Sequence, residues 1–137
     1  MAARKKPTFE DRVAEYVDSP NVTCRLRYGN KVSARIRGNY GVYRTYVAPA
    51  SKKLTGDCSC PSEIWPCKHV HALRETWNAN PKSFFDLDVW LKQLSRQSKE
   101  ELLEAIGKMV VEAPELLGLF DVEGFEFGED EENEWYG

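Results

Sequence analysis

Alternating polar and apolar residues fill much of the first half of the chain and predict an antiparallel sheet. Residues 23–28 (TCRLRY) and 32–37 (VSARIR) alternate with a period of two, as strands with one buried face do. The Gly29-Asn30 pair between them is typical of a β-hairpin turn. Residues 40–47 (YGVYRTYV) follow as the next strand of the predicted sheet.

The register of this hairpin decides which face carries its arginines. A two-residue loop would place Arg25 and Arg27 on the same face as Ala34 and Val32, which mixes charged with apolar side chains. A three-residue loop over residues 29–31 separates the two kinds, so we expect that register. The predicted buried face then consists of Cys24, Leu26, Tyr28, Val32, Ala34 and Ile36. The predicted outer face carries Arg25, Arg27, Arg35 and Arg37.

Helical periodicity appears on both sides of the sheet region. Thr8 is placed to cap a short helix that ends before Ser19-Pro20. Apolar residues three and four apart predict a second helix over residues 70–77 and a third that begins near Asp86. An S-x-x-E capping box at Ser98 starts a fourth helix, which Pro114 ends or restarts.

Four side chains that bind transition metals lie within twelve residues of the chain. They are Cys58, Cys60, Cys67 and His69, in the string CSCPSEIWPCKH. Zinc takes about four thiolate and imidazole ligands, and Cys₃His is one of its closed structural sets. Side chains two apart on a strand point to the same side, and a helix N-terminus favours thiolate. We therefore predict one structural Zn²⁺ held between a strand, a loop and a helix.

Two other interpretations of this cluster stay open. Three cysteines within ten residues also suit disulfides, but no hydrophobic secretory segment follows residues 1–6, so we expect an intracellular, cytoplasmic protein. A catalytic Cys/His pair is the second alternative. No cysteine stands out as a nucleophile, and a filled ligand shell leaves no position for water, so we expect no enzymatic activity. No apolar run approaches the roughly 20 residues that a membrane span needs.

The C-x-C pair, followed after six residues by C-x-H, resembles the SWIM zinc finger, whose pattern is C-x-C-x(n)-C-x-H. The resemblance covers roughly residues 40–78. It implies a ββα zinc-binding fold that binds nucleic acid or protein, and it favours His69 over His71 as the fourth ligand. Residues 84–120 are similar to the helical region that follows the finger in small prokaryotic SWIM proteins.

These patterns together predict an α+β fold in four segments. Residues 1–20 form an N-terminal helix, and residues 21–80 form a small antiparallel sheet with a ββα SWIM zinc finger. Residues 81–120 form C-terminal helices. Residues 121–137 form an acidic tail that we expect to be disordered, with aromatic pairs at 125/127 and 135/136 as docking points.

Charge is divided unequally along the 137 residues. Residues 1–97 hold 17 Lys/Arg and 9 Asp/Glu, whereas residues 98–137 hold 2 and 13. Between residues 19 and 56 there are eight basic residues and no acid, which favours the phosphate backbone of DNA or RNA as a partner. The predicted contacts are Arg25, Arg27, Arg35, Arg37 and Arg44, and Tyr40, Tyr43 and Tyr46 either stack on bases or pack in the core. The alternative function is an adaptor that binds a protein through the C-terminal helices and acidic tail.

Overall fold

The structure is a computed structural model that describes residues 5–128 of the chain. Its contacts divide these residues into two units, the first ending at Asp88 and the second beginning at Val89. Strands and helices are both present in the first unit, and the second contains helices only among its described residues. The predicted α+β fold is confirmed.

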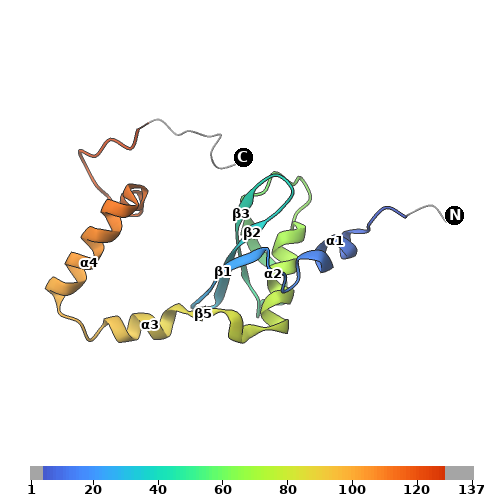
Figure 1. Cartoon of the computed structure of the whole chain (residues 1–137), viewed down its shortest axis with the longest axis horizontal. Helices are drawn as coiled ribbons and strands as arrows, with labels where there is room; N and C mark the ends of the chain where they lie inside the picture. Colours follow the sequence, from blue (N-terminus) through green and yellow to red (C-terminus); the bar gives the residue numbers. More distant parts are fainter. Residues whose placement is uncertain (1–4, 129–137) are drawn as a thin grey trace. The chain divides into compact units, whose positions relative to one another are not determined.

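A five-stranded sheet forms the centre of the first unit (Figure 1). Its strands are β1 (Val22–Tyr28), β2 (Lys31–Arg37), β3 (Val42–Ala48), β4 (Thr55–Cys58) and β5 (Phe85–Asp86). They lie in the order β4-β3-β2-β1-β5, with β1 to β4 antiparallel to their neighbours and β5 parallel to β1. Strands β1 to β4 therefore form a meander. The edge strand β5 lies beside β1, although it follows β1 by more than fifty residues in the chain.

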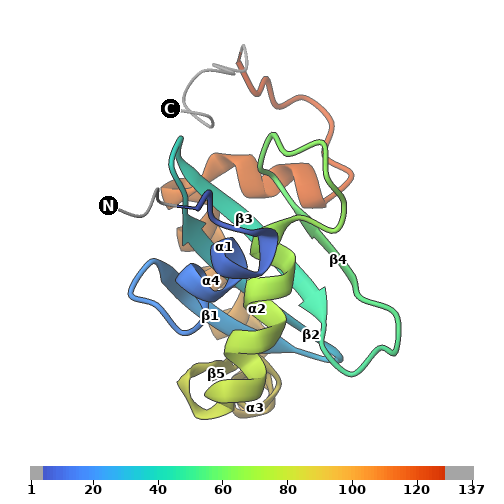
Figure 2. The same cartoon turned by 90° about the vertical axis from the view of Figure 1, so that its right-hand side faces the viewer.

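Two helices, α1 (Phe9–Tyr16) and α2 (Lys68–Ala79), lie across one face of this sheet (Figure 2). Thr8 caps α1 as predicted, because its hydroxyl accepts a hydrogen bond from the Asp11 amide and the Asp11 carboxylate accepts one from the Thr8 amide. The apolar side of α2 packs on the sheet, and the fully buried residues include Ile36, Val47, Val70 and Leu73. A short 3₁₀ turn, η1 (Pro81–Ser83), leads from α2 into β5. The inward-facing side chains of the strands, which recur every two residues, and the apolar side of α2 thus form one core.

The predicted register of the β1–β2 hairpin is wrong. The loop has two residues, since Tyr28 pairs with Lys31, and Arg27 pairs with Val32. A β-bulge between Thr23 and Leu26 then shifts the register, so that Val22 still pairs with Ile36 in the core. Sequence reasoning assumed an unbroken alternation along the strand, and a bulge breaks it.

Cys24 lies inside this bulge with a left-handed backbone, at φ 52°. Its side chain is exposed, so its predicted place in the apolar face of the hairpin is wrong. The bulge also turns the arginine that follows it, Arg25, toward the helix-covered side of the sheet, where Arg25 lies over the ring of the buried Phe84. One extra residue in β1 therefore changes the positions of both Cys24 and Arg25.

The second unit contains two helical segments after α3 (Leu87–Leu94), which begins in the first unit. They are α4 (Lys99–Glu112) and the 3₁₀ segment η2 (Pro114–Leu119). Ser98 caps α4 and Pro114 opens η2, as predicted. No side chain of residues 89–128 is fully buried.

Residues 121–128 form no helix or strand, and Phe125 contacts Phe127 edge to face at 4.9 Å between ring centroids. The other predicted docking pair, Trp135 and Tyr136, lies outside the described residues. No helix within residues 5–128 has the length and apolar character that a membrane span requires.

Candidate metal centre

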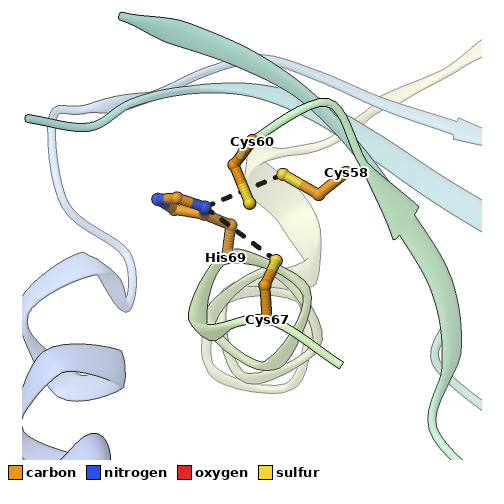
Figure 3. A group of neighbouring side chains, drawn as sticks. All are labelled: Cys58, Cys60, Cys67 and His69. Atoms are coloured by element: carbon orange, nitrogen blue, oxygen red, sulfur yellow. Dashed lines mark hydrogen bonds between the residues drawn. The ribbon is translucent and has the colours of Figure 1, made fainter. Parts of the chain in front are cut away.

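The four predicted ligand side chains converge at one point between the sheet and α2 (Figure 3). The Sγ atoms of Cys58, Cys60 and Cys67 and one ring nitrogen of His69 all lie within 4.8 Å of one another. Nδ1 of His69 is 3.7 Å from Cys58 Sγ and 3.9 Å from Cys67 Sγ. A strand, a loop and a helix therefore present three sulfur atoms and one nitrogen to a common centre.

Three elements position these ligands, and one detail differs from the prediction. Cys58 is the last residue of β4, whereas Cys60 lies beyond the end of the strand. The pairing with β3 continues to Ser59, whose amide donates to the Arg44 carbonyl and whose hydroxyl accepts from the Arg44 amide. Ser59 thus holds the chain in place while Cys60 turns toward the metal position.

Helix α2 supplies the other half of the site. Cys67 is its N-cap and His69 lies in its first turn, so both ligands stand at the positive end of the helix dipole. Cys67 is fully buried and His69 is only 3% exposed. Burial among core residues fixes the orientation of both ligands in the folded protein.

The thiols of the cluster are polarised by one another. A hydrogen bond from Cys58, together with one from His69, lowers the pKa of Cys67 to about 4. The same contact with Cys67, followed by burial, raises the pKa of Cys58, and burial raises the pKa of Cys60. These hydrogen bonds favour the thiolate form at Cys67, and binding of a metal ion to the cluster releases the thiol protons that remain.

The donor set fits a tetrahedral zinc ion. With Zn–S near 2.3 Å and Zn–N near 2.0 Å, neighbouring ligand atoms of a tetrahedral site lie about 3.5–3.8 Å apart. The sulfur–nitrogen distances of 3.7 and 3.9 Å are close to this range. Four residues are thus positioned to hold one metal ion, compatible with zinc, and all four positions of a tetrahedral shell are supplied by the protein.

The ring of His69 settles which histidine belongs to the cluster. Its Nδ1 faces the thiols, and its other nitrogen, Nε2, is buried between Tyr16 and Tyr43 with no hydrogen-bond partner within residues 5–128. His71, the alternative ligand, instead contacts the Phe9 ring edge to face at 5.3 Å. The structure therefore brings His69 and not His71 to the three cysteines.

One contact of the centre was missed by sequence reasoning. The Thr45 hydroxyl lies 3.2 Å from Cys58 Sγ, and Thr45 is 1% exposed. A buried hydroxyl beside a thiolate stabilises its charge by donating a hydrogen bond. The sequence contained a signal, because Thr45 is a polar residue at an inward position of β3, between the buried Tyr43 and Val47.

The predicted outer-face cluster of arginines is only partly present. Arg25 is directed into the first unit, where its guanidinium bonds to Asp18 at 2.6 Å and to the Ser83 hydroxyl at 2.7 Å. The same contact holds the pKa of Asp18 below its usual value. The predicted outer-face position of Arg25 is wrong, and the reason is the bulge in β1.

Arg27 likewise differs from its predicted position on the outer face. It pairs with Val32 and bonds to Asp86 at 3.1 Å and Asp88 at 3.3 Å, which ties β1 to the β5 segment. Contact of Arg25 and Arg27 with nucleic acid stays a prediction. In this structure both guanidinium groups bind carboxylates of the chain itself.

The other three predicted arginines lie on the face of the sheet opposite the helices. Arg35 and Arg37 alternate with the buried Ala34 and Ile36, and Arg44 is directly opposite Arg35 in the β2–β3 ladder. All three side chains are exposed. This surface, with Arg35, Arg37 and Arg44, is called the arginine face below.

The three tyrosines of the third strand region have different places. Tyr43 is buried beside His69, Tyr46 is exposed and donates to Asp57, and Tyr40 is 75% exposed in the turn before β3. Of these three tyrosines, Tyr43 packs in the core, which was one of the two predicted alternatives.

No family model, no curated protein and no solved structure matches the chain. The geometry shows four residues between positions 58 and 69 of an α+β domain that are placed to hold one metal ion.

Proposed function

We propose that the chain is a non-catalytic zinc protein of the SWIM type that binds nucleic acid through its arginine face. The observation that carries the proposal is the direct opposition of two exposed arginines, Arg35 and Arg44, in the β2–β3 register. Like charges opposite each other in a ladder destabilise the sheet, and an anion between them removes that cost. Phosphate is the anion that the planar fork of arginine binds best.

The surroundings of these arginines support the same partner. Arg37 extends the row along β2, and neither Arg35 nor Arg37 forms an ion pair with any residue between 5 and 128. The face is hollowed, with a concavity of about 520 Å³ lined by Arg35, Arg44, Tyr46 and Ser59 among others. A concave surface lined by charges of one sign focuses their electric field. Two arginines in a concavity therefore attract a phosphate backbone more strongly than two arginines on a flat surface would.

The metal centre supports the absence of catalysis and the SWIM assignment. A shell filled by three thiolates and an imidazole leaves no position for a water molecule, which a catalytic zinc keeps. The C-x-C half at the end of a strand and the C-x-H half at the start of a helix give the strand, loop and helix that the SWIM pattern implies. Zinc here joins β4 to α2 and so holds the sheet that carries the arginine face.

The test measures binding of the full, zinc-loaded chain to fluorescein-labelled DNA and RNA oligonucleotides over a range of salt concentrations. One variant combines Arg35→Ala, Arg37→Ala and Arg44→Ala. Its control combines Lys52→Ala, Lys53→Ala and Lys82→Ala, which remove the same charge from exposed positions off this face. Loss of three phosphate contacts should lower the slope of log K against log salt by about 2, by counterion release on a single strand.

The control variant should keep most of the wild-type slope. Equal losses in the two variants would mean that net charge, and not the arginine face, carries the binding. An unaltered protein that binds no oligonucleotide near physiological salt would refute the proposed function.

A second candidate function, a protein adaptor, is favoured by one observation in the second unit. Helix α4 carries an apolar stripe, of which Leu103, Ile106 and Met109 are exposed and Leu102 and Val110 are partly buried. The stripe consists of Leu102, Leu103, Ile106, Met109 and Val110. Eight of the ten charged residues in segment 98–128 are acids, so the partner with complementary charge is a basic amphipathic helix.

The adaptor is tested by retention of a protein partner on the immobilised chain after nuclease treatment of a host lysate. Ile106→Asp places a charge in the stripe, and Val111→Asp makes the same kind of change on the opposite side of α4. A partner that Val111→Asp retains and Ile106→Asp loses supports the adaptor. A partner that both variants retain equally contradicts it.

A further inference from the structure

A small pocket lies beside the metal centre, on the first unit, and nothing in the proposed function uses it. Its volume is about 200 Å³. Its wall is built from α1, the β2–β3 turn, the loop between Cys60 and Cys67 and the first turn of α2. The residues that matter for its chemistry are Phe9, Arg12, Tyr40, Ile64, Lys68 and His69.

A buried hydrogen-bond donor forms part of this wall. His69 is only 3% exposed, and its Nε2 has no partner within residues 5–128. If Nδ1 binds the metal, the neutral imidazole carries its proton on Nε2, which is then a donor. Metal-bound histidines nearly always give that proton to a carboxylate, a carbonyl or water. Nε2 points away from the thiols (Figure 3), so the missing acceptor must come from the side of the ring opposite the metal.

The charge of the pocket indicates the kind of acceptor. Arg12 and Lys68 both line it, and within the described part of the chain neither forms an ion pair. Lys68 places its ammonium over the Tyr16 ring at 5.5 Å. Two cations and one uncharged donor around a cavity favour an anionic group with further oxygen acceptors.

The wall also carries aromatic and apolar side chains, and several of them are exposed. Tyr40 is 75% exposed, Ile64 is 64% exposed, and Phe9 is 36% exposed. Exposed aromatics next to basic residues are the surface on which unpaired bases stack. The pocket thus offers an apolar platform next to its cations, which matches a nucleotide with a flat base and a charged phosphate.

The pocket is smaller than a typical small-molecule site, so it encloses only part of a ligand. Pockets that enclose whole small molecules usually have roughly 300–1,000 Å³. A volume of about 200 Å³ accommodates part of one unit of a longer chain, with the rest of that unit and of the chain outside. The β2–β3 turn connects the two surfaces, because Arg37 ends β2 three residues before Tyr40.

We propose that this pocket binds one unpaired nucleotide of a single-stranded nucleic acid, with its base on Tyr40 and its phosphate between Arg12 and Lys68. The proposal rests on the proposed function and sharpens it, because it selects single strands over duplexes. His69 lines the same pocket beside the bound nucleotide, and the metal centre orients its ring without taking part in any reaction.

The experiment compares variants of the full, zinc-loaded chain for binding to a fluorescein-labelled oligothymidylate and to a duplex of matched length. Tyr40→Ala removes the stacking surface, and Tyr28→Ala is its control because Tyr28 is also an exposed tyrosine at 60% and lies outside the pocket. Tyr40→Ala should weaken single-strand binding about tenfold with the salt slope unchanged. Arg12→Ala should weaken it and lower the slope by about 0.7. Tyr28→Ala should change it less than about twofold, because it removes no surface of the pocket.

A second measurement follows the imidazole of His69 directly. In long-range ¹H–¹⁵N NMR spectra of the zinc-loaded protein, the Nε2 resonance should shift when the oligothymidylate binds, and the shift should vanish in Tyr40→Ala. The same spectra show whether each variant keeps its fold.

The outcomes separate this inference from the function on which it rests. Binding that depends on the arginine face but is unchanged in Tyr40→Ala and Arg12→Ala overturns the pocket and leaves the function standing. Equal weakening of single-strand and duplex binding by Tyr40→Ala also overturns it, because a paired base cannot enter the pocket. A wild-type chain that binds neither oligonucleotide overturns both.

Discussion

The two faces of the sheet use arginine in opposite ways. On the helix-covered side, Arg25 is 13% exposed in its side chain and bonds to Asp18, while Arg27 bonds to Asp86 and Asp88. On the arginine face, Arg35 and Arg37 are exposed and form no ion pair with residues 5–128. The same residue type is part of the internal structure on one side and is available to a partner on the other.

A single backbone irregularity produces this difference. Without the bulge at Cys24, strict alternation would place Arg25 on the face opposite Val22. With the bulge, Arg25 donates through Nε to the Val22 carbonyl and reaches the carboxylate of Asp18. The difference shows that a run of basic residues is not a binding surface until the register of each strand is known.

Removal of the metal should have the largest effect, and it should act on the helix-covered side. Cys67 is part of the buried core, so Cys67→Ser removes a ligand and a core contact together. Structural zinc contributes on the order of 10 kcal/mol in small zinc-finger domains, which equals the whole stability of such a unit. Cys67→Ser or chelation should therefore unfold the sheet, as measured by circular dichroism and native mass spectrometry.

Cys24→Ser is the matched control, because Cys24 is exposed and outside the cluster. That variant should retain one zinc per chain and the wild-type melting temperature. A chelated wild-type protein that melts at the same temperature as the zinc-loaded form would show that the core alone holds the helix-covered side together.

The next largest effect is expected at Gly56 of β4, which packs tightly against the backbone of β3 and against α2. A Cβ at this position would overlap the Tyr46 carbonyl oxygen and lie 2.9 Å from Val70 Cγ1. Gly56→Ala should therefore displace β4 from β3 and from α2 and cost about 3 kcal/mol in the free energy of unfolding. Urea unfolding followed by circular dichroism measures this cost, and zinc affinity should fall with it because β4 carries Cys58.

Gly107 provides the control substitution, since it lies in α4 and a Cβ added there would meet no atom within 4 Å. Gly107→Ala should stabilise its helix by up to about 1 kcal/mol. A loss of stability in Gly56→Ala together with a gain in Gly107→Ala would confirm that the cost at Gly56 comes from close packing, and not from the replacement of a glycine as such. A Gly56→Ala variant as stable as the wild type would contradict this account.

Much of the fold was predictable from the sequence, because period and capping are local properties. Thr8 and Ser98 cap their helices as predicted, since a hydroxyl three residues before an acidic residue is satisfied within one turn. The four ligands were predictable from residue type and spacing alone. Both successes rest on residues close together in the chain.

The failures involve contacts between residues far apart in the chain. The carboxylates that bind Arg27, Asp86 and Asp88, lie some sixty residues after it, and no local pattern pairs them. The bulge at Cys24 has no glycine to mark it, although a left-handed backbone usually favours one. Thr45 and the pocket beside His69 likewise depend on how α1 and α2 pack on the sheet, which the sequence pattern does not specify.

Neutralising one arginine on each face should change the free energy of unfolding by different amounts, and both changes should be smaller than those above. Arg25→Gln removes the bonds of a mostly buried guanidinium to the Ser83 hydroxyl and the Val22 carbonyl, so it should cost about 2 kcal/mol in the free energy of unfolding. It also leaves Asp18 without its cation, so the pKa of that carboxyl should return toward its usual value. Because the folded-state pKa is lowered in the wild type, the stability that this pair contributes should be present at neutral pH and disappear as the solution becomes acidic.

Chemical denaturation at several pH values, with the Asp18 carboxyl followed by NMR, measures both effects. Arg35→Gln is the matched substitution on the arginine face and should change stability by less than about 0.5 kcal/mol. Equal costs for the two variants would mean that both arginines are structural, and the contrast between the faces would be wrong.

The smallest effect concerns the repulsion between Arg35 and Arg44 across the β2–β3 ladder. Arg35→Thr should stabilise the free protein by about 0.3 kcal/mol at low salt, because it removes a like-charge pair and places a β-branched residue in a strand. Arg35→Lys keeps the charge and should show no gain. In about 1 M salt, where the Debye length falls to about 3 Å, the repulsive part of the gain should disappear. A loss of stability in Arg35→Thr at both salt concentrations would show that Arg35 supports the sheet, and the reason to place a phosphate between the two arginines would then be gone.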